Sequence, residues 1–407
     1  MKKSAALFVY VWPEPRSSAA GIRTHELARI LQSEGYEVQA YSGCAANEAM
    51  AEWEALGVKC HLAPSNDSAV EGLLAAQDPG LVIYDRFVME EHFGWRLRAR
   101  WPGALHLIDT QDIHAIRRAR ERMLKRGAAP HELKSPSEED LGEDLLRELA
   151  SLHRADACLV VSSFEKEWLI GQGYDARRVH HLPFSADPAA GNPSYSERTG
   201  FCMLGNFRHA PNLDSVNFLV REIWPALREK IPQAALFLYG AYPPAQVSCL
   251  DGKKGIRVPG PVVDHRRALQ KHRVLLAPLR FGAGIKGKVL EAWACGTAVA
   301  GTPIAFEGLS PEQGVGLGDE FLARAFALHE NEEDFISATR QGKSILETSF
   351  TGEAVRASLM GFLARAFHER LAFRGQLTGR MLRLQQNNAT KYFSLWIEAK
   401  NKKGPTG

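Results

Sequence analysis

Short apolar runs with β propensity alternate with helical stretches almost throughout this chain, and this alternation constrains its fold most strongly. Runs of this kind are typical of strands buried on both faces of a parallel sheet that helices cover. We therefore predict an α/β protein. The expected strands occupy residues 6–11, 37–41, 58–62, 81–84, 105–108, 158–161, 179–182, 201–204, 235–239, 256–258, 274–277 and 298–300.

A stretch with proline and glycine at residues 185–198 interrupts the alternation and is typical of a linker. The pattern then starts afresh, and after about Glu320 only helical patterns remain. A chain of 407 residues is long enough for two or three domains. We expect an N-terminal Rossmann-like domain at 1–190, a C-terminal Rossmann-like domain at 198–350, and helices at 351–407 that return to the first domain. Two such sheets bind ligands at the carboxyl ends of their strands.

The C-terminal segment at residues 376–400 carries many large apolar side chains, from Met381 to Ile397. A segment of this composition is too apolar to remain an unfolded, solvated tail. We therefore predict that it folds as helix, with these side chains packed against the first domain.

The formal net charge of +3 is too small to indicate a nucleic-acid partner, and we predict none. The charge is uneven: from Arg365 onward nine Lys/Arg face two Glu, so this part is +7 and the rest −4. A second basic run at 117–126 precedes an acidic stretch at 138–144. We expect these two to neutralise each other across a helical hairpin. The alternative is a surface that meets anionic lipid or a phosphorylated acceptor.

The six cysteines have neither CxxC nor metal-ligand spacing, which is typical of reduced thiols in the cytosol. The apolar run after Met1 breaks at Pro13 without a cleavage site, which favours a buried strand over a signal peptide. No apolar stretch reaches the roughly 18 residues that a membrane span needs. We expect a cytoplasmic protein with at most salt-sensitive, peripheral contact at the inner face of an anionic membrane.

The chemistry is concentrated at residues 278–296, where a buried strand leads through a glycine-rich loop into a helix. Gly282 and Gly284 let the backbone approach a ligand, and the helix start offers free N–H groups and a positive dipole end. Lys286 and Lys288 add full positive charges. Together these features predict a phosphate or diphosphate site.

Glu291 lies on that helix among apolar residues, where an unpaired carboxylate is costly. Since a carboxylate can accept hydrogen bonds from two ribose hydroxyls, we predict a nucleotide pocket. Gly282, Gly284 and Gly287 also spell the dinucleotide fingerprint, with Glu307 twenty residues beyond. The motif nevertheless lies in the second domain, and four residues separate the strand from the first glycine, where the fingerprint requires a tight turn.

The segment resembles the donor-binding motif of glycosyltransferase family 4, in the branch that carries Gly-x-Gly-x-Lys-x-Lys-x-x-Glu. Four further stretches are similar to motifs of that family and follow in the same order. The resemblance covers roughly residues 5–350. The four stretches are the glycine loop at 13–23, a Val-Ser-x-x-Glu stretch within 156–165, the opening of the second domain at 205–212, and a Glu-Gly-Leu turn within 302–309.

This resemblance implies the GT-B fold, in which two Rossmann-like domains face each other across a cleft and the C-terminal helices pack back on the first. It implies that the second domain binds the donor, a UDP or GDP sugar, and the first an acceptor, which is a glycan, a lipid-linked molecule, a protein or a small molecule. It further implies a hexosyl- or related transferase of glycan biosynthesis that retains anomeric configuration and needs neither cofactor nor metal.

One departure bears on the mechanism. Many members of the family carry a first Glu eight residues before Glu291, and Ala283 stands there. A catalytically inactive nucleotide-sugar-binding homologue, or a partner subunit, is therefore the alternative, followed by an NAD(P)-binding oxidoreductase.

The candidate site residues follow strands or begin helices at the predicted cleft. For Asp112 a helix cap, for Arg208 an exposed loop cation and for Asp85 a buried ion pair are the structural alternatives. The catalytic candidates are Lys286 and His114; the donor candidates are Gly21, Arg208, Gly282, Gly284, Lys286, Lys288, Glu291 and Glu307; the acceptor-side candidates are Asp85, Asp112 and His114.

Overall fold

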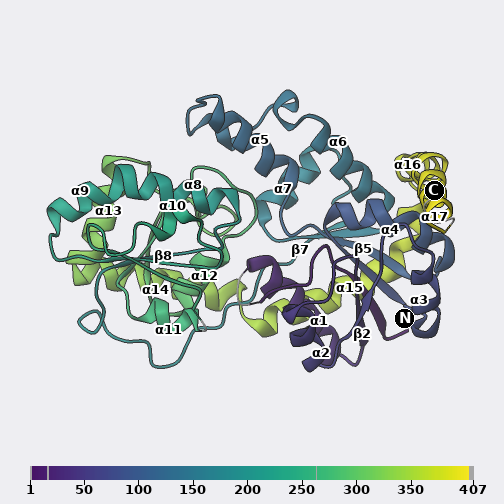
Figure 1. The fold of residues 1–407 in the computed structure, drawn as a ribbon, viewed down its shortest axis with the longest axis horizontal. Helices are drawn as coiled ribbons and strands as arrows, with labels where there is room; N and C mark the ends of the chain where they lie inside the picture. Colours follow the sequence, from purple (N-terminus) through teal and green to yellow (C-terminus); the bar gives the residue numbers. More distant parts are fainter. Residues whose placement is uncertain (1, 16–17, 263, 403–407) are drawn as a thin grey trace, which may run out of the picture.

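The computed structural model describes residues 2–15, 18–262 and 264–402. Two α/β domains, each built on a parallel sheet, lie side by side along the long axis of the molecule (Figure 1). The predicted fold class is therefore confirmed.

The first domain holds a seven-stranded sheet in the order β3-β2-β1-β4-β5-β6-β7, and all its pairings are parallel. Buried apolar side chains cover both faces, as the continuous apolar runs predicted. Its strands are β1 (Ser4–Phe8), β2 (Glu37–Ser42), β3 (Lys59–Leu62), β4 (Leu81–Asp85), β5 (Leu105–Asp109), β6 (Ala157–Val160) and β7 (Val179–His181).

Helices follow most of these strands, and side-chain caps mark several of their starts. Ser137 and Asp140 form a reciprocal capping box at the start of α6. The helices are α1 (Ala19–Ser33), α2 (Glu48–Ala55), α3 (Ala69–Gln77), α4 (Arg86–Arg100), α5 (His114–Lys125), α6 (Glu138–Arg154) and α7 (Ser163–Gly171), with a 3-10 turn η1 (Glu132–Lys134).

The antiparallel pair α5 and α6 brings together the basic and acidic runs of the sequence. Arg118 and Arg122 both pair with Asp144, at 2.5 and 3.1 Å, and Arg126 pairs with Asp140 at 2.5 Å. The expected neutralisation across a helical hairpin is therefore confirmed.

The second domain holds a five-stranded parallel sheet in the order β10-β9-β8-β11-β12. Its strands are β8 (Phe201–Leu204), β9 (Leu236–Tyr239), β10 (Ile256–Gly260), β11 (Val274–Ala277) and β12 (Ala298–Gly301). Its helices are α8 (Ala210–Phe218), the π-helix η2 (Leu219–Ile223), α9 (Trp224–Lys230), α10 (Ala245–Ser248), α11 (His265–Gln270), α12 (Gly287–Ala294), the 3-10 turn η3 (Pro311–Gln313), α13 (Asp319–Glu330) and α14 (Glu332–Ser349).

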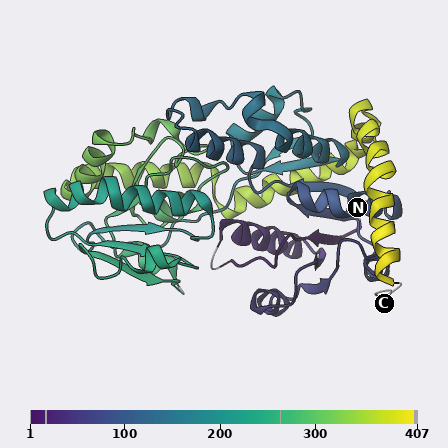
Figure 2. The same ribbon diagram turned by 45° about the horizontal axis from the view of Figure 1, so that its top comes forward.

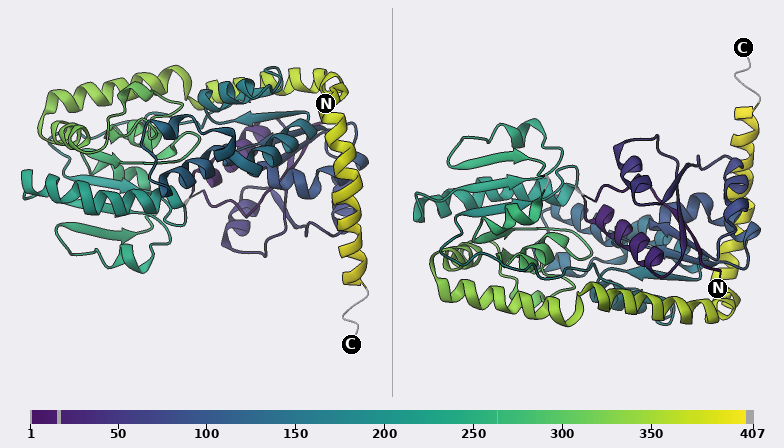
Figure 3. Two further views of the ribbon diagram at one scale, coloured as in Figure 1. Left: turned by 90° about the horizontal axis from the view of Figure 1, so that it is seen from above. Right: turned by 90° about the horizontal axis from the view of Figure 1, so that it is seen from below.

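The chain then returns to the first domain through α15 (Gly352–Gly375), whose Leu359 and Phe362 join a core cluster of the first sheet. Three further segments follow: α16 (Leu377–Gln386), the π-helix η4 (Asn387–Lys391) and α17 (Tyr392–Lys402). They cross the end of the first domain that lies away from the second (Figures 2 and 3). Lys403, which contributes to the basic tail, lies outside the described residues.

The prediction for this tail is right about its helical structure and wrong about its buried face. Met381, Phe393 and Trp396 are exposed, whereas Gln386 and Glu398 are buried. The reason is that the surface beneath the tail is polar, so the polar side chains turn inward. None of the helices described here combines the length and apolarity needed to cross a bilayer.

Candidate active site in the interdomain cleft

A cavity of about 630 Å³ opens between the two domains. Its walls come from the segments after β1, β4 and β5 of the first domain and after β8, β9, β10 and β11 of the second. These are carboxyl ends of parallel strands, where ligands bind in open α/β sheets. Most of the predicted site residues line it.

The glycine loop between β11 and α12 forms a wall of the cavity on the side of the second domain. Gly284 adopts φ +67°, and a Cβ there would lie 3.0 Å from Val161 Cγ2 of the first domain, so glycine is needed for the close domain contact. Gly282 lines the cavity, whereas Gly284 packs against the other domain. The loop therefore both faces the cavity and joins the domains.

Two lysines bring positive charge to this wall. Lys286 Nζ donates to the carbonyl oxygens of Gly284 (2.6 Å) and Ala283 (3.2 Å), and the third ammonium hydrogen has no other acceptor among the described residues. Lys288 Nζ donates to Asn212 Oδ1 at 2.6 Å. Burial, reinforced by Lys286, lowers the pKa of Lys288 to about 7. An anion at this wall would hold both lysines in the charged form.

Glu291 lines the cavity and already has a partner there. His265 Nε2 lies 3.0 Å from Glu291 Oε1. The hydrogen bond to Glu291 raises the pKa of His265. The second carboxylate oxygen has no partner among the described residues, so it is available to a ligand hydroxyl.

On the facing wall, α1 begins at the loop that follows β1. Gly21 lines the cavity, but its N–H donates to the Ser18 cap at 3.0 Å. A Cβ on Gly21 would lie 2.3 Å from the carbonyl oxygen of Glu14, so the glycine permits close packing of the loop. Gly21, a donor candidate, therefore faces the cavity, but its own N–H is used by the helix cap. Arg16 and Ser17 of the same loop lie outside the described residues.

Arg208 lines the cavity from the loop after β8, with its guanidinium carbon 3.5 Å from the ring centroid of Tyr242. The Tyr242 hydroxyl donates to Glu14 of the first domain at 3.0 Å. A cation stacked in this way is held in place and is still free to face an anion.

His114 and Asp112 line the cavity at the start of α5. Asp112 accepts from Arg117 at 2.6 Å and lies 3.2 Å from His114 Nε2, and the buried Nδ1 of His114 has no partner in the described part of the chain. Burial lowers the pKa of His114 to about 4, so the ring is neutral. With a proton on Nε2, facing Asp112, Nδ1 is the unprotonated nitrogen, and it is buried rather than exposed to the cavity.

Asp85 also lines the cavity, where its Oδ2 accepts from the Tyr10 N–H at 3.1 Å and pairs with Arg86 at 3.5 Å. Asp85 is therefore both a partner in an ion pair and a residue of the cleft, the two possibilities that the sequence left open.

Glu307 does not line the cavity. Both of its oxygens accept from Arg120 of α5, at 2.9 and 2.7 Å, and Arg120 also donates to the Gly282 carbonyl at 2.6 Å. The Arg120 side chain is fully buried. Glu307 is therefore part of an interdomain ion pair in this structure, because the domain contact brings an arginine to this donor candidate.

Sequence reasoning missed both Arg120 and His265. Arg120 belongs to a run that looks like surface charge, but it follows Ile116 by four residues and so shares the buried face of α5. That spacing was a usable signal. For His265, which lies on a short helix 26 residues before Glu291, we find no signal in the sequence.

Residues 198–340 match the model of a family described as glycosyl transferases group 1. The match spans the second domain, and with the fold it identifies the chain as a glycosyltransferase. No curated protein matches the chain.

Solved structures similar to the chain support the GT-B fold. Sucrose-phosphate synthase of Thermosynechococcus elongatus is 16% identical, with a TM-score of 0.62 over 90% of this chain and 99% of that one. HepE of Anabaena, in complex with UDP and glucose, is 11% identical, with a TM-score of 0.64 over 89% and 99%. The pneumococcal O-GlcNAc transferase GtfA, in complex with UDP and GlcNAc, is 12% identical, with a TM-score of 0.55 over 74% and 60%.

Proposed function

We propose that the protein transfers a sugar from a nucleoside-diphosphate sugar, with UDP the favoured nucleotide, to an acceptor bound by the first domain. The observation that carries the proposal is the cavity wall of residues 282–291. There Lys286 and Lys288 lie at the start of α12, and the carboxylate of Glu291 lies on the same helix. UDP complexes among the structural neighbours favour UDP over GDP. The order of the motifs further supports membership of glycosyltransferase family 4.

In this proposal the diphosphate lies against Lys286, Lys288 and Arg208, and the ribose hydroxyls donate to Glu291. Cleavage of the glycosidic bond places negative charge on the leaving diphosphate, and preorganised cations stabilise that charge. Because these cations come from side chains, we propose that transfer needs no metal. Among the described residues, no group of three or more His, Cys, Asp and Glu is placed to hold one.

The sugar would lie between the loop and the start of α5. His114 lines this part of the cavity, and its neutral ring would pack against the sugar in this arrangement. Asp112 brings a carboxylate to the loop, since its Cβ lies 3.2 Å from the position of a Cβ on Gly284. We propose that it supplies negative charge near the site where Ala283 replaces the first Glu of the family motif. Departure of the diphosphate and attack by the acceptor on the same face would retain the anomeric configuration.

A thermal-shift panel of UDP, GDP, dTDP and CMP sugars tests the donor, and donor hydrolysis is then assayed with and without EDTA. We expect UDP sugars to raise the melting temperature most and hydrolysis to survive EDTA. Lys286→Ala should slow turnover at saturating donor, because its charge matters most as the diphosphate leaves.

Three results would count against the proposal. Stabilisation by NAD without any response to nucleotide sugars would indicate an oxidoreductase. Nucleotide binding without hydrolysis or transfer for any sugar would indicate an inactive homologue. Loss of activity in EDTA that manganese restores would contradict metal independence.

A further inference from the structure

The last three segments of the chain, α16, η4 and α17, bury polar positions and expose apolar ones. Gly379, Gln386, Ser394 and Glu398 face the first domain and are buried. The large apolar side chains on the other side are between 58% and 69% exposed. These residues, here named the outward stripe, are Leu377, Met381, Leu384, Tyr392, Phe393 and Trp396.

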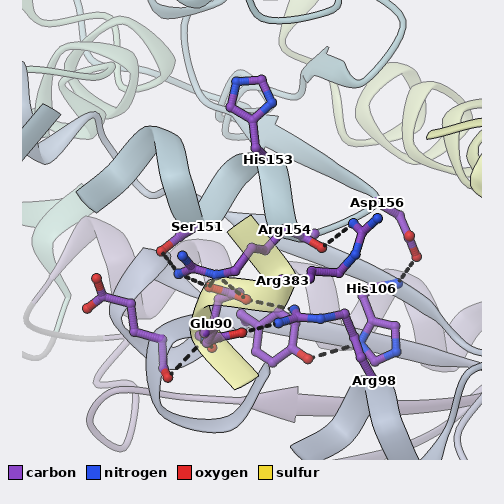
Figure 4. A network of polar contacts seen from close by, with 12 residues as sticks. Glu90, Arg98, His106, Ser151, His153, Arg154, Asp156 and Arg383 are labelled. Atoms are coloured by element: carbon purple, nitrogen blue, oxygen red, sulfur yellow. Dashed lines mark hydrogen bonds and ion pairs between the residues drawn. The ribbon is translucent and has the colours of Figure 1, made fainter. Parts of the chain in front are cut away.

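A polar network beneath the tail explains this orientation (Figure 4). Glu90 is fully buried between Arg154 and Arg98, at 2.6 and 2.7 Å. From the tail, Gln386 accepts from Arg98 at 2.5 Å and Glu398 accepts from Arg96 at 3.3 Å. Rotating the helices to bury the stripe would leave these arginines facing apolar groups, which costs more than the exposure. The outward direction of the stripe is thus set by the first domain.

The charged side chains around the outward stripe are positive. Residues 376–402 contain five Lys/Arg and a single carboxylate, Glu398, which is turned inward. In the described part of the chain Arg380, Lys391 and Lys400 have no carboxylate partner. Lys391 and Lys400 lie 5.7 and 5.4 Å from the ring centroids of Tyr392 and Trp396. Cations therefore flank exposed aromatic rings.

We propose that the outward stripe binds the interfacial region of an anionic lipid bilayer, with the helices lying in the membrane plane. Apolar and aromatic side chains on one helix face, bordered by Lys/Arg, are what such a surface selects, and Trp and Tyr favour the headgroup level. The stripe extends over about 30 Å, from the helical rise of 1.5 Å per residue. A second copy on the same face is disfavoured, because a symmetric contact would bring the like charges of the two tails together.

Membrane binding through the outward stripe differs from the purely salt-sensitive contact that the basic runs of the sequence predict. The run on α5 is neutralised by α6, and the apolar stripe contributes a component that salt does not screen. It does not rest on the proposed sugar transfer, and its test reads vesicle binding, so either proposal can fail without the other.

Co-sedimentation of the full chain with vesicles of phosphatidylglycerol and phosphatidylcholine tests the proposal, with phosphatidylcholine vesicles for comparison. We expect binding to the anionic vesicles that falls in 0.5 M NaCl but persists in part. Leu384→Ser with Trp396→Ser should lower the partition coefficient on the order of tenfold or more at either salt concentration. Arg380→Gln and Lys400→Gln should each lower it about fivefold, at low salt only.

Leu146→Ser on α6 is the matched control, since Leu146 is 64% exposed and Leu384 62%. It should bind as the wild type does. Circular dichroism and melting temperature establish that each variant is folded, which is expected because the replaced side chains are exposed. Absence of wild-type binding, or equal binding of the stripe variants, would overturn the proposal. A dimer in sedimentation velocity that Leu384→Ser dissociates, without vesicle binding, would assign the stripe to a second copy.

Discussion

One oxygen of the Glu291 carboxylate is paired with His265, so nucleotide binding is expected to depend on the second oxygen and on the full charge. We predict that Glu291→Gln weakens UDP binding. Hydrogen bonds to a charged acceptor contribute about 1.5–3 kcal/mol, so the loss should be on the order of 10- to 150-fold. Isothermal titration with UDP measures it.

Glu347→Gln replaces an exposed carboxylate on α14; it is the control for this prediction and should leave the UDP affinity unchanged. Equal affinities of Glu291→Gln and wild type would mean that Glu291 is a structural carboxylate and that the ribose lies elsewhere.

Lys288 should make diphosphate binding depend on pH, because its pKa in the free protein is lowered to about 7 by burial. A bound diphosphate favours the charged form and raises that pKa, so the contribution of Lys288 is complete below pH 7 and declines as pH rises towards the bound value. The terminal phosphate of UDP, with a pKa of about 6, stays ionised over this window.

We therefore predict that UDP affinity falls on the order of tenfold between about pH 7 and pH 8.5, with proton uptake on binding. Titration in buffers of different ionisation enthalpy measures this uptake. Lys288→Arg, which stays charged, should give a flatter profile. A wild-type affinity that is constant over this window would show that Lys288 does not change protonation on binding.

Among the elements, α5 and the loop between β11 and α12 are joined by Arg120, which binds both Glu307 and the Gly282 carbonyl. We predict that Arg120→Met destabilises the protein by about 3–5 kcal/mol, because Glu307 keeps a buried charge without its partner. It should also lower kcat, since the loop that presents Lys286 loses its support. Adding Glu307→Gln to the Arg120→Met variant should restore part of its stability, because the unpaired charge is removed, but little of its turnover.

Urea unfolding and donor turnover of the two variants measure these effects. Arg122→Met is the control on the same helix: its side chain is 45% exposed and pairs with Asp144, so we expect a change below about 1 kcal/mol. An Arg120→Met protein with wild-type turnover would show that the loop holds its position without the interdomain contact.

At the scale of the whole molecule, the C-terminal tail stabilises the first domain through polar contacts. Truncation after Arg374 removes three hydrogen bonds between the tail and arginines of the first domain. The pairs are Gln376–Arg178, Gln386–Arg98 and Glu398–Arg96. We predict that the truncation lowers the melting temperature by about 5–10 °C, from roughly 1.5–3 kcal/mol for each of the three bonds to a charged group.

The same truncation should raise solubility, because it removes the outward stripe and uncovers a polar surface. Calorimetry and solubility measurements test both effects. A fall in solubility would mean that the tail covers apolar surface of the first domain, and an unchanged melting temperature would make it an appendage.

The sequence alone determined the class of fold and the strands, because strands buried on both faces must be continuously apolar, and this holds whatever their neighbours are. It also located one wall of the cavity, since a glycine loop that leads into a helix has local chemistry. The sequence did not determine which face of the C-terminal tail is buried, because composition does not say which surface of the first domain the helices contact.

Only the tertiary structure decided the partners that lie far apart along the chain. Glu307 binds Arg120 rather than the cavity, Glu291 pairs with His265, and the N–H of Gly21 is used by Ser18. The physical reason is that a buried polar group must find a partner wherever the packed domains offer one. These partners lie on surfaces that only the folded chain brings into contact, so the sequence alone does not identify them.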